Sequence, residues 1–205
     1  MVNIEHDLLP KQKPRKNNLK VKVDLYAYSS ELYDEVSSIG IIQRLRDVSQ
    51  LGLIRVPKEL TKSRFDYMIL QLHFHQLIKQ SLQAQLELTY NNKVKAKEFP
   101  PDTQYIPGGA LPTIGDLLQL LTIACSLGHF FNTFTASRAV VMLAEKNPDF
   151  RNILIHSSPS QRFQMISKKL LSEHNYQRLH LLNSLLVLER CDQNKHSVIL
   201  AQELL

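Results

Sequence analysis

The sequence predicts an all-α protein with a small extended element near its N-terminal end. Three observations lead to this fold class. Apolar residues recur at helical spacing from Glu31 onward, prolines and glycines divide that pattern into segments of helix length, and only one short stretch alternates between apolar and polar residues. The 205 residues are 43% hydrophobic and 21% charged, a balance typical of a chain that folds around one core.

The domain organisation follows from where this pattern begins. Residues 1–20 contain lysines, prolines and asparagines without an apolar period, so we expect a flexible basic arm. Residues 21–205 are expected to form a single helical domain. At its start, apolar residues alternate with polar ones through Val21, Val23 and Leu25, which predicts a short strand able to pair in a hairpin.

The next segments predict two helices, the second of them long. From Glu31, one apolar stripe runs through Leu32, Val36 and Ile39 and continues through Leu45, Val48 and Leu51, so the first helix is expected to end at Gly52. Ser63 is placed as the N-cap of a long helix from Arg64 to about Leu88. The side chains expected to be buried along it are those of Phe65, Ile69, Leu72, Leu77 and Leu82.

Residues 89–112 hold four prolines and paired glycines, and they predict a long loop of functional or partner-binding character. Thr113 is a candidate N-cap for the helix that follows, which ends at Gly128 and is apolar on almost every side, so it should be central to the core. Further helices are expected at 133–146, 158–172, 175–190 and 195–205, with Pro148 and Pro159 marking breaks.

Two segments resemble a known family. IIQRLRDVSQLGLIRVPKELTKSRFDYMI (Ile41–Ile69) and LLQLLTIACSLGHFF (Leu117–Phe131) are similar to the HD-domain phosphohydrolases, in particular the deoxynucleotide triphosphohydrolases. Members of that branch contain roughly FQRLRxIKQLG, then S/TRFEHSLG, then LLHDIGHGPFSH. The resemblance covers about half the chain and implies an HD-domain-like helical bundle.

The resemblance also implies that the metal site has been lost. In the family, the His of RFEH and the His-Asp pair of LLHDIGH hold a divalent metal, and the matching positions here are Tyr67, Cys125 and Ser126. A phenol, a thiol without a charged neighbour and a hydroxyl do not replace imidazole and carboxylate ligands at neutral pH. We therefore expect no catalytic residues at these positions, no bound metal and no cofactor.

The residues that the resemblance implies for nucleotide and phosphate binding are retained. They are Gln50, Leu51, Arg64 and His129, and a guanidinium with an imidazole can hold a phosphate without hydrolysing it. A purely structural interpretation stays open beside this one. In it, Arg64 pairs with Asp66 or Asp47 on the surface, and His129 caps the helix that ends near Leu127.

Three functional hypotheses follow. The preferred one is a catalytically inactive HD-domain-like protein, a pseudoenzyme that binds a nucleotide or phosphate, or a protein partner, with self-association into a homo-oligomer as a natural extension. The second is an active nucleotide phosphohydrolase with a relocated site, using Cys125 or His129. The third is nucleic-acid binding through the basic arm, whose cations are Lys11, Lys13, Arg15, Lys16, Lys20 and Lys22. We favour a solvated arm over the third, because no aromatic residue is interleaved for base stacking.

The same sequence predicts a cytoplasmic protein without membrane contact. No apolar run reaches the roughly 20 residues that cross a bilayer, and the N-terminal residues lack the order of a secretory signal. Cys125 and Cys191 have no partner at metal-ligand spacing, and both are expected to be reduced core thiols.

Overall fold

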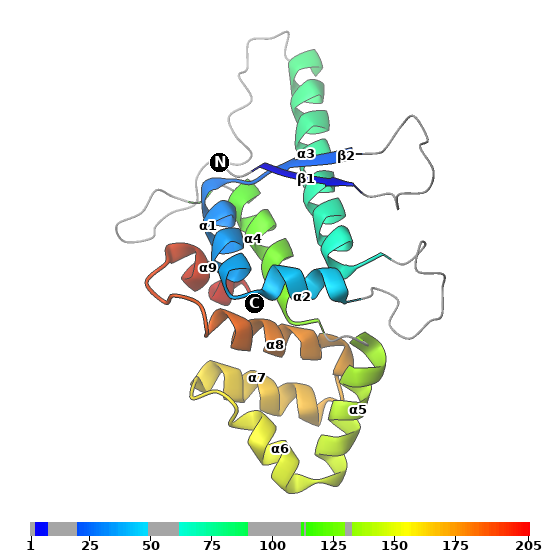
Figure 1. Ribbon diagram of the computed structural model, residues 1–205, viewed down its shortest axis with the longest axis vertical. Coiled ribbons are helices and arrows are strands. Elements are labelled where there is room, and N and C mark those ends of the chain that lie inside the picture. Colours follow the sequence, from blue (N-terminus) through cyan, green and yellow to red (C-terminus); the bar gives the residue numbers. More distant parts are fainter. Residues whose placement is uncertain (1–2, 8–19, 49–61, 90–111, 113, 130–132) are drawn as a thin grey trace.

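Helices make up most of the computed structural model, which describes residues 3–7, 20–48, 62–89, 112, 114–129 and 133–205. In Figure 1, α8 (Leu179–Leu188) crosses the middle of the molecule, with one group of helices on each side. The all-α prediction with a small extended element is confirmed. The predicted loop at 89–112 lies outside the described residues, except for Thr89 at the end of a helix and Pro112.

The two strands form an antiparallel pair, β1 (Asn3–Asp7) and β2 (Lys20–Asp24), in which Ile4 lies opposite Val23. Ile4, Val21 and Val23 face the core, whereas Glu5 and Lys22 are exposed opposite each other. The short strand was predicted correctly. The prediction of a flexible arm was wrong for residues 3–7, because β1 pairs with β2 and the buried side chain of Ile4 extends the apolar face that β2 presents to the helices.

The single helix predicted from Glu31 to Gly52 is two helices in the structure, and the first begins earlier, at Ala27. α1 (Ala27–Ser38) ends before Gly40, whose φ of 77° lets the chain turn directly into α2 (Ile41–Asp47). α2 ends at Asp47 instead of near Gly52, since Val48 is extended and its carbonyl accepts a hydrogen bond of 2.8 Å from the backbone N–H of Arg64. This bond joins the end of α2 to the start of the long helix.

The long helix, α3 (Arg64–Thr89), begins where Ser63 predicted. The hydroxyl of Ser63 accepts from the backbone N–H of Asp66 at 3.1 Å, and the carboxylate of Asp66 accepts from the backbone N–H of Ser63 at 2.7 Å, a reciprocal capping box. Phe65, Ile69 and Leu72 are fully buried as expected. Leu77 is 40% exposed, contrary to the prediction, and Phe74 and Ile78 are exposed beside it.

The first core surrounds α4 (Ile114–Leu127), whose Leu120, Ile123 and Leu127 are fully buried. This confirms the predicted central position of that helix. Around it pack the sheet, α1, α2, α3 and α9 (His196–Leu204). Figure 1 shows α4 between α1 and α3.

A second core lies on the other side of α8, among α5 (Thr133–Lys146), α6 (Pro148–Ile155) and α7 (Gln161–Ser172). The break predicted at Pro148 is the start of α6, because proline suits the first position of a helix and the side chain of Asn147 accepts from the N–H of Phe150 at 3.0 Å. A 3-10 turn, η2 (Tyr176–Arg178), leads into α8.

In the part of the chain that the structure describes, no helix combines the length and apolar character needed to span a membrane.

Candidate functional site

The C-terminal end of α4 is held against the first turns of α8 by hydrogen bonds from both sides. The N–H of Gly128 donates to the hydroxyl of Ser184 at 2.9 Å, and the side-chain amide of Asn183 donates to the carbonyl of Gly128 at 3.1 Å. The Ser184 hydroxyl donates in turn to the carbonyl of His180 at 3.1 Å. His129, the next residue after Gly128, is thereby placed beside the start of α8.

His129 and His180 stack face to face. Their ring centroids lie 4.5 Å apart and the planes differ by 7°. Nδ1 of His180 lies 2.9 Å from the carbonyl of Gln177, and since a carbonyl only accepts, this nitrogen carries the proton in the neutral ring. Nδ1 of His129 is buried without a hydrogen-bond partner in the described parts of the chain.

Arg44 approaches the same place from α2. One terminal nitrogen of its guanidinium donates to the carbonyl of His129 at 2.9 Å, and the other donates to the carbonyl of Leu127. A guanidinium at a helix C-terminus satisfies carbonyls that have no partner within the helix and neutralises the negative end of the helix dipole. Arg44 is therefore the C-terminal cap of α4, the role that the structural interpretation of the sequence gave to His129. Burial lowers the pKa of Arg44.

Arg64 contributes a second guanidinium from the first position of α3. It is only 8% exposed, so it is not the surface residue that the structural interpretation of the sequence expected. Burial lowers its pKa, opposed by the nearby phenol of Tyr67. The charge of Arg64 lowers the pKa of both His129 and His180, which places it within electrostatic reach of the stacked pair.

The electrostatics of this cationic cluster (Arg44, Arg64, His129 and His180) are set by burial and by like charge. The pKa of His129 is lowered to about 3, first by burial and then by Arg64, His180 and Arg44. Burial is also the main cause of the lowered pKa of His180, which its hydrogen bond to Gln177 partly opposes. Both imidazoles are neutral at pH 7, so Arg44 and Arg64 carry the positive charge of the cluster, and both lower the pKa of His129. A bound anion would be attracted by these two like charges.

The structure brings together two of the four residues predicted to bind a ligand, Arg64 and His129. The other two, Gln50 and Leu51, lie outside the described residues. Arg44 and His180 were missed. Arg44 stands in the IIQRLRD segment that carries the family resemblance, which could have drawn attention to it, whereas His180 follows no motif and is identified only by its contact with His129.

The three positions that match metal ligands of the family differ in environment. Tyr67 is 37% exposed on α3. On α4, the buried hydroxyl of Ser126 donates to the carbonyl of Thr122 at 2.8 Å, and burial raises the pKa of the Cys125 thiol. Within the described ranges, no three His, Cys, Asp or Glu side chains lie close enough together to hold a metal ion.

The two histidines in the middle of α3, His73 and His75, differ in their hydrogen-bond partners. The hydroxyl of Thr122 on α4 donates to the carbonyl of Leu118, so it accepts from Nε2 of His75 at 3.0 Å. This bond joins α3 to α4, and burial lowers the pKa of His75. His73 does not share this partner, and its Nδ1 is buried without a hydrogen bond to any described residue.

The basic arm is described only at its edges. Lys22 is exposed on β2 opposite Glu5. Lys11, Lys13, Arg15 and Lys16 lie outside the described residues, and Lys20 is described only as the first position of β2.

Comparison with known proteins found no match to this chain among family models, curated proteins or solved structures. The resemblance to HD-domain phosphohydrolases therefore rests on the two sequence segments alone.

Proposed function

We propose that this protein binds a phosphate-bearing ligand, a nucleotide above all, at the cationic cluster and does not hydrolyse it. The observation that carries the proposal is the stacked pair of neutral histidines beside two partly desolvated arginines. Concentrating positive charge in one half-buried place costs free energy in the free protein. An anion with several acceptor oxygens reduces that cost and accepts hydrogen bonds from guanidinium and imidazole.

The chemistry of the same residues supports binding without turnover. A general base is effective when its pKa lies near the working pH, and a histidine with a pKa of about 3 is too weak to activate water efficiently. The hydroxyl of Ser126 is engaged within its helix, and the Cys125 thiol stays protonated because burial raises its pKa. These features favour a pseudoenzyme over the alternative of a relocated hydrolytic site.

The proposal is tested by calorimetric titration of the full chain with ATP, dATP and pyrophosphate, first in EDTA and then with Mn²⁺. We expect saturable binding in EDTA, and no nucleotide product by chromatography after incubation with the metal. Binding should be at least tenfold weaker in His180→Ala and Arg44→Met. The matched control is Arg138→Gln, which removes the same charge from an exposed position on α5.

Two results would overturn the proposal. One is metal-dependent product formation, which would favour the hydrolase. The other is an affinity in His180→Ala and Arg44→Met equal to that of the control, which would place the anion elsewhere, the basic N-terminal arm included.

A further inference from the structure

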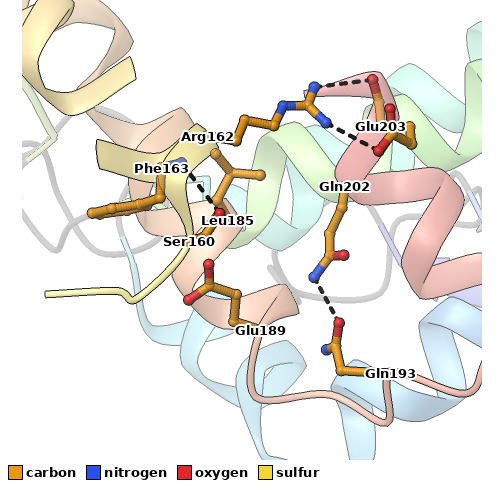
Figure 2. A pocket seen from close by; sticks show the side chains of 8 residues that line it. All are labelled: Ser160, Arg162, Phe163, Leu185, Glu189, Gln193, Gln202 and Glu203. Atoms are coloured by element: carbon orange, nitrogen blue, oxygen red, sulfur yellow. Dashed lines mark hydrogen bonds and ion pairs between the residues drawn. The ribbon is translucent and has the colours of Figure 1, made fainter. Parts of the chain in front are cut away.

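A concave site lies away from the cationic cluster, between the start of α7, the end of α8 and α9. Its volume is about 390 Å³, within the range of sites that hold small molecules or single side chains. Figure 2 shows the side chains that line it. His180 lies in the first turn of α8, whereas Glu189 is the residue after its last turn, so the two sites are at opposite ends of one helix.

The cavity has an apolar floor and a closed ion pair on one side. Phe163 and Leu185 are buried side chains that line it from α7 and α8. Arg162 lies 3.3 Å from the carboxylate of Glu203 and donates to the backbone carbonyl of the same residue at 3.3 Å. The positive charge of Arg162 is thus matched by Glu203, as the dashed lines in Figure 2 mark.

The two amide side chains in the lining, Gln193 and Gln202, are fixed in orientation by their hydrogen-bond partners. The side-chain nitrogen of Gln193 donates to the carbonyls of Leu188 and Cys191, at 2.7 and 2.8 Å, and these carbonyls only accept. The oxygen of Gln193 then accepts from the side-chain nitrogen of Gln202 at 3.0 Å. The side-chain oxygen of Gln202 is left as an acceptor that no described donor occupies.

Glu189 supplies the uncompensated charge. One of its carboxylate oxygens accepts from the hydroxyl of Ser158 at 2.7 Å, and the other receives no hydrogen bond from the described residues. Among the cavity-lining side chains, Glu189 and Glu203 carry two negative charges and Arg162 one positive charge, so the lining has a net charge of −1. A cation is favoured here and an anion is repelled.

We propose that this cavity binds an organic ammonium group carried on an aliphatic stem. The ammonium is held by the open carboxylate oxygen of Glu189, which follows the last turn of α8, and the stem lies over Phe163 and Leu185. An ammonium has three donors and no acceptor, which complements a site whose donors are used and whose acceptors are open. A free diamine and the side chain of a lysine in a peptide offer this same chemistry.

The test is a nuclear magnetic resonance titration of the isotope-labelled full chain with three probes of similar length. These are 1,5-diaminopentane, Nα-acetyl-lysine amide and the neutral 1-pentanol. We expect saturable shifts of the backbone amides in the first turn of α7, the last turn of α8 and α9, with either amine and not with pentanol. Binding of the diamine alone identifies free amines as the source, and binding of the lysine derivative alone identifies a peptide side chain.

Glu189→Gln should weaken amine binding at least tenfold. Glu173→Gln is the matched control, because it removes the same charge from an exposed position outside the cavity. Gln202→Glu adds a negative charge to the cavity lining and should tighten binding several-fold, which keeps the test decisive if Glu189→Gln does not fold. Equal loss in Glu189→Gln and Glu173→Gln, shifts outside the three segments, or no saturable shift with either amine would overturn the proposal.

Discussion

Gly128 lies so close to His180 that no side chain fits between them. A Cβ atom at position 128 would lie 1.9 Å from the carbonyl oxygen of His180 and 2.4 Å from the backbone nitrogen of Ser184. Both are backbone atoms of α8, so the clash is relieved only by moving the whole helix away from α4. The closeness of these two backbones is what allows the ring of His129 to stack on that of His180.

Gly128→Ala should therefore lower the free energy of unfolding by about 3 kcal/mol or more, as overpacking against backbone does. Gly40→Ala is an informative comparison. Nothing lies within 4 Å of a Cβ at Gly40, so only its φ of 77° opposes the change and the expected cost is about 1 kcal/mol. Chemical denaturation of both variants checks the order, and a larger loss in Gly40→Ala would contradict it.

The stability of the protein should fall as the pH is lowered from about 6.5 toward 3. His129 is neutral in the folded state down to a pKa of about 3, whereas in the unfolded chain it titrates near its ordinary value of 6.5. Below 6.5 the unfolded state therefore binds more protons. The contribution of neutral His129 to the free energy of unfolding is therefore complete above pH 6.5. As the pH falls below that value, this contribution decreases by up to roughly 1.4 kcal/mol per pH unit. His180 acts in the same direction.

Denaturation of the wild type and of His129→Gln at pH 7, 6, 5 and 4 isolates this effect from the titration of carboxylates. The difference in unfolding free energy between the two proteins should shrink as the pH falls, because glutamine carries no titrating group. A difference that stays constant across this range would show that His129 does not titrate as described.

The guanidinium of Arg44 should contribute measurably to stability through α4. Arg44→Met keeps an aliphatic stem but leaves the carbonyls of Leu127 and His129 without charged donors, and the expected loss is about 2 kcal/mol. Arg46→Met is the control on the same helix. It removes a guanidinium that lies 4.6 Å from the ring centre of Phe65 and hydrogen-bonds to Tyr33, contacts at an exposed residue that are together worth about 1 kcal/mol.

Thermal and chemical unfolding of Arg44→Met and Arg46→Met give the two losses directly. Equal losses would mean that the hydrogen bonds of Arg44 to the end of α4 add nothing beyond general charge.

The thiol of Cys125 should react slowly with alkylating reagents at pH 7 to 8. Burial raises its pKa, and the thiolate is the reactive form. Cys125→Ala should leave nucleotide affinity unchanged, because this residue is not part of the cationic cluster. Rapid alkylation of Cys125, or loss of a nucleotide-hydrolysing activity in the alanine variant, would instead support the relocated hydrolytic site.

Sequence periodicity correctly predicted those helices that bury one face against a single core. α5 (Thr133–Lys146) was predicted with the same ends, and Ser63 marked the start of α3, because caps and apolar stripes are local signals. The predictions failed where a partner distant in sequence decides the outcome. β1 is ordered by pairing with β2, and α2 ends early because Val48 pairs with the start of α3.

In the candidate site, too, local motifs predicted some residues, whereas contacts between residues distant in sequence determine the others. Arg64 and His129 were found through their positions in motifs, and the structure places His129 within electrostatic reach of the charge of Arg64. The two remaining members depend on long-range contacts. Arg44 reaches the end of α4 from α2, and His180 meets His129 only because Gly128 allows α8 to approach so closely. No local pattern encodes such an approach.

The position of α8 between the two groups of helices should make it one of the last elements to unfold. Leu182 and Leu185 belong to the core shared with α5, α6 and α7, whereas Leu188 belongs to the core around α4. The backbone of α8 is exposed to solvent only when both cores have separated from it. In native-state hydrogen exchange, its amides should be among the slowest in the molecule, with opening free energies that approach the value for global unfolding.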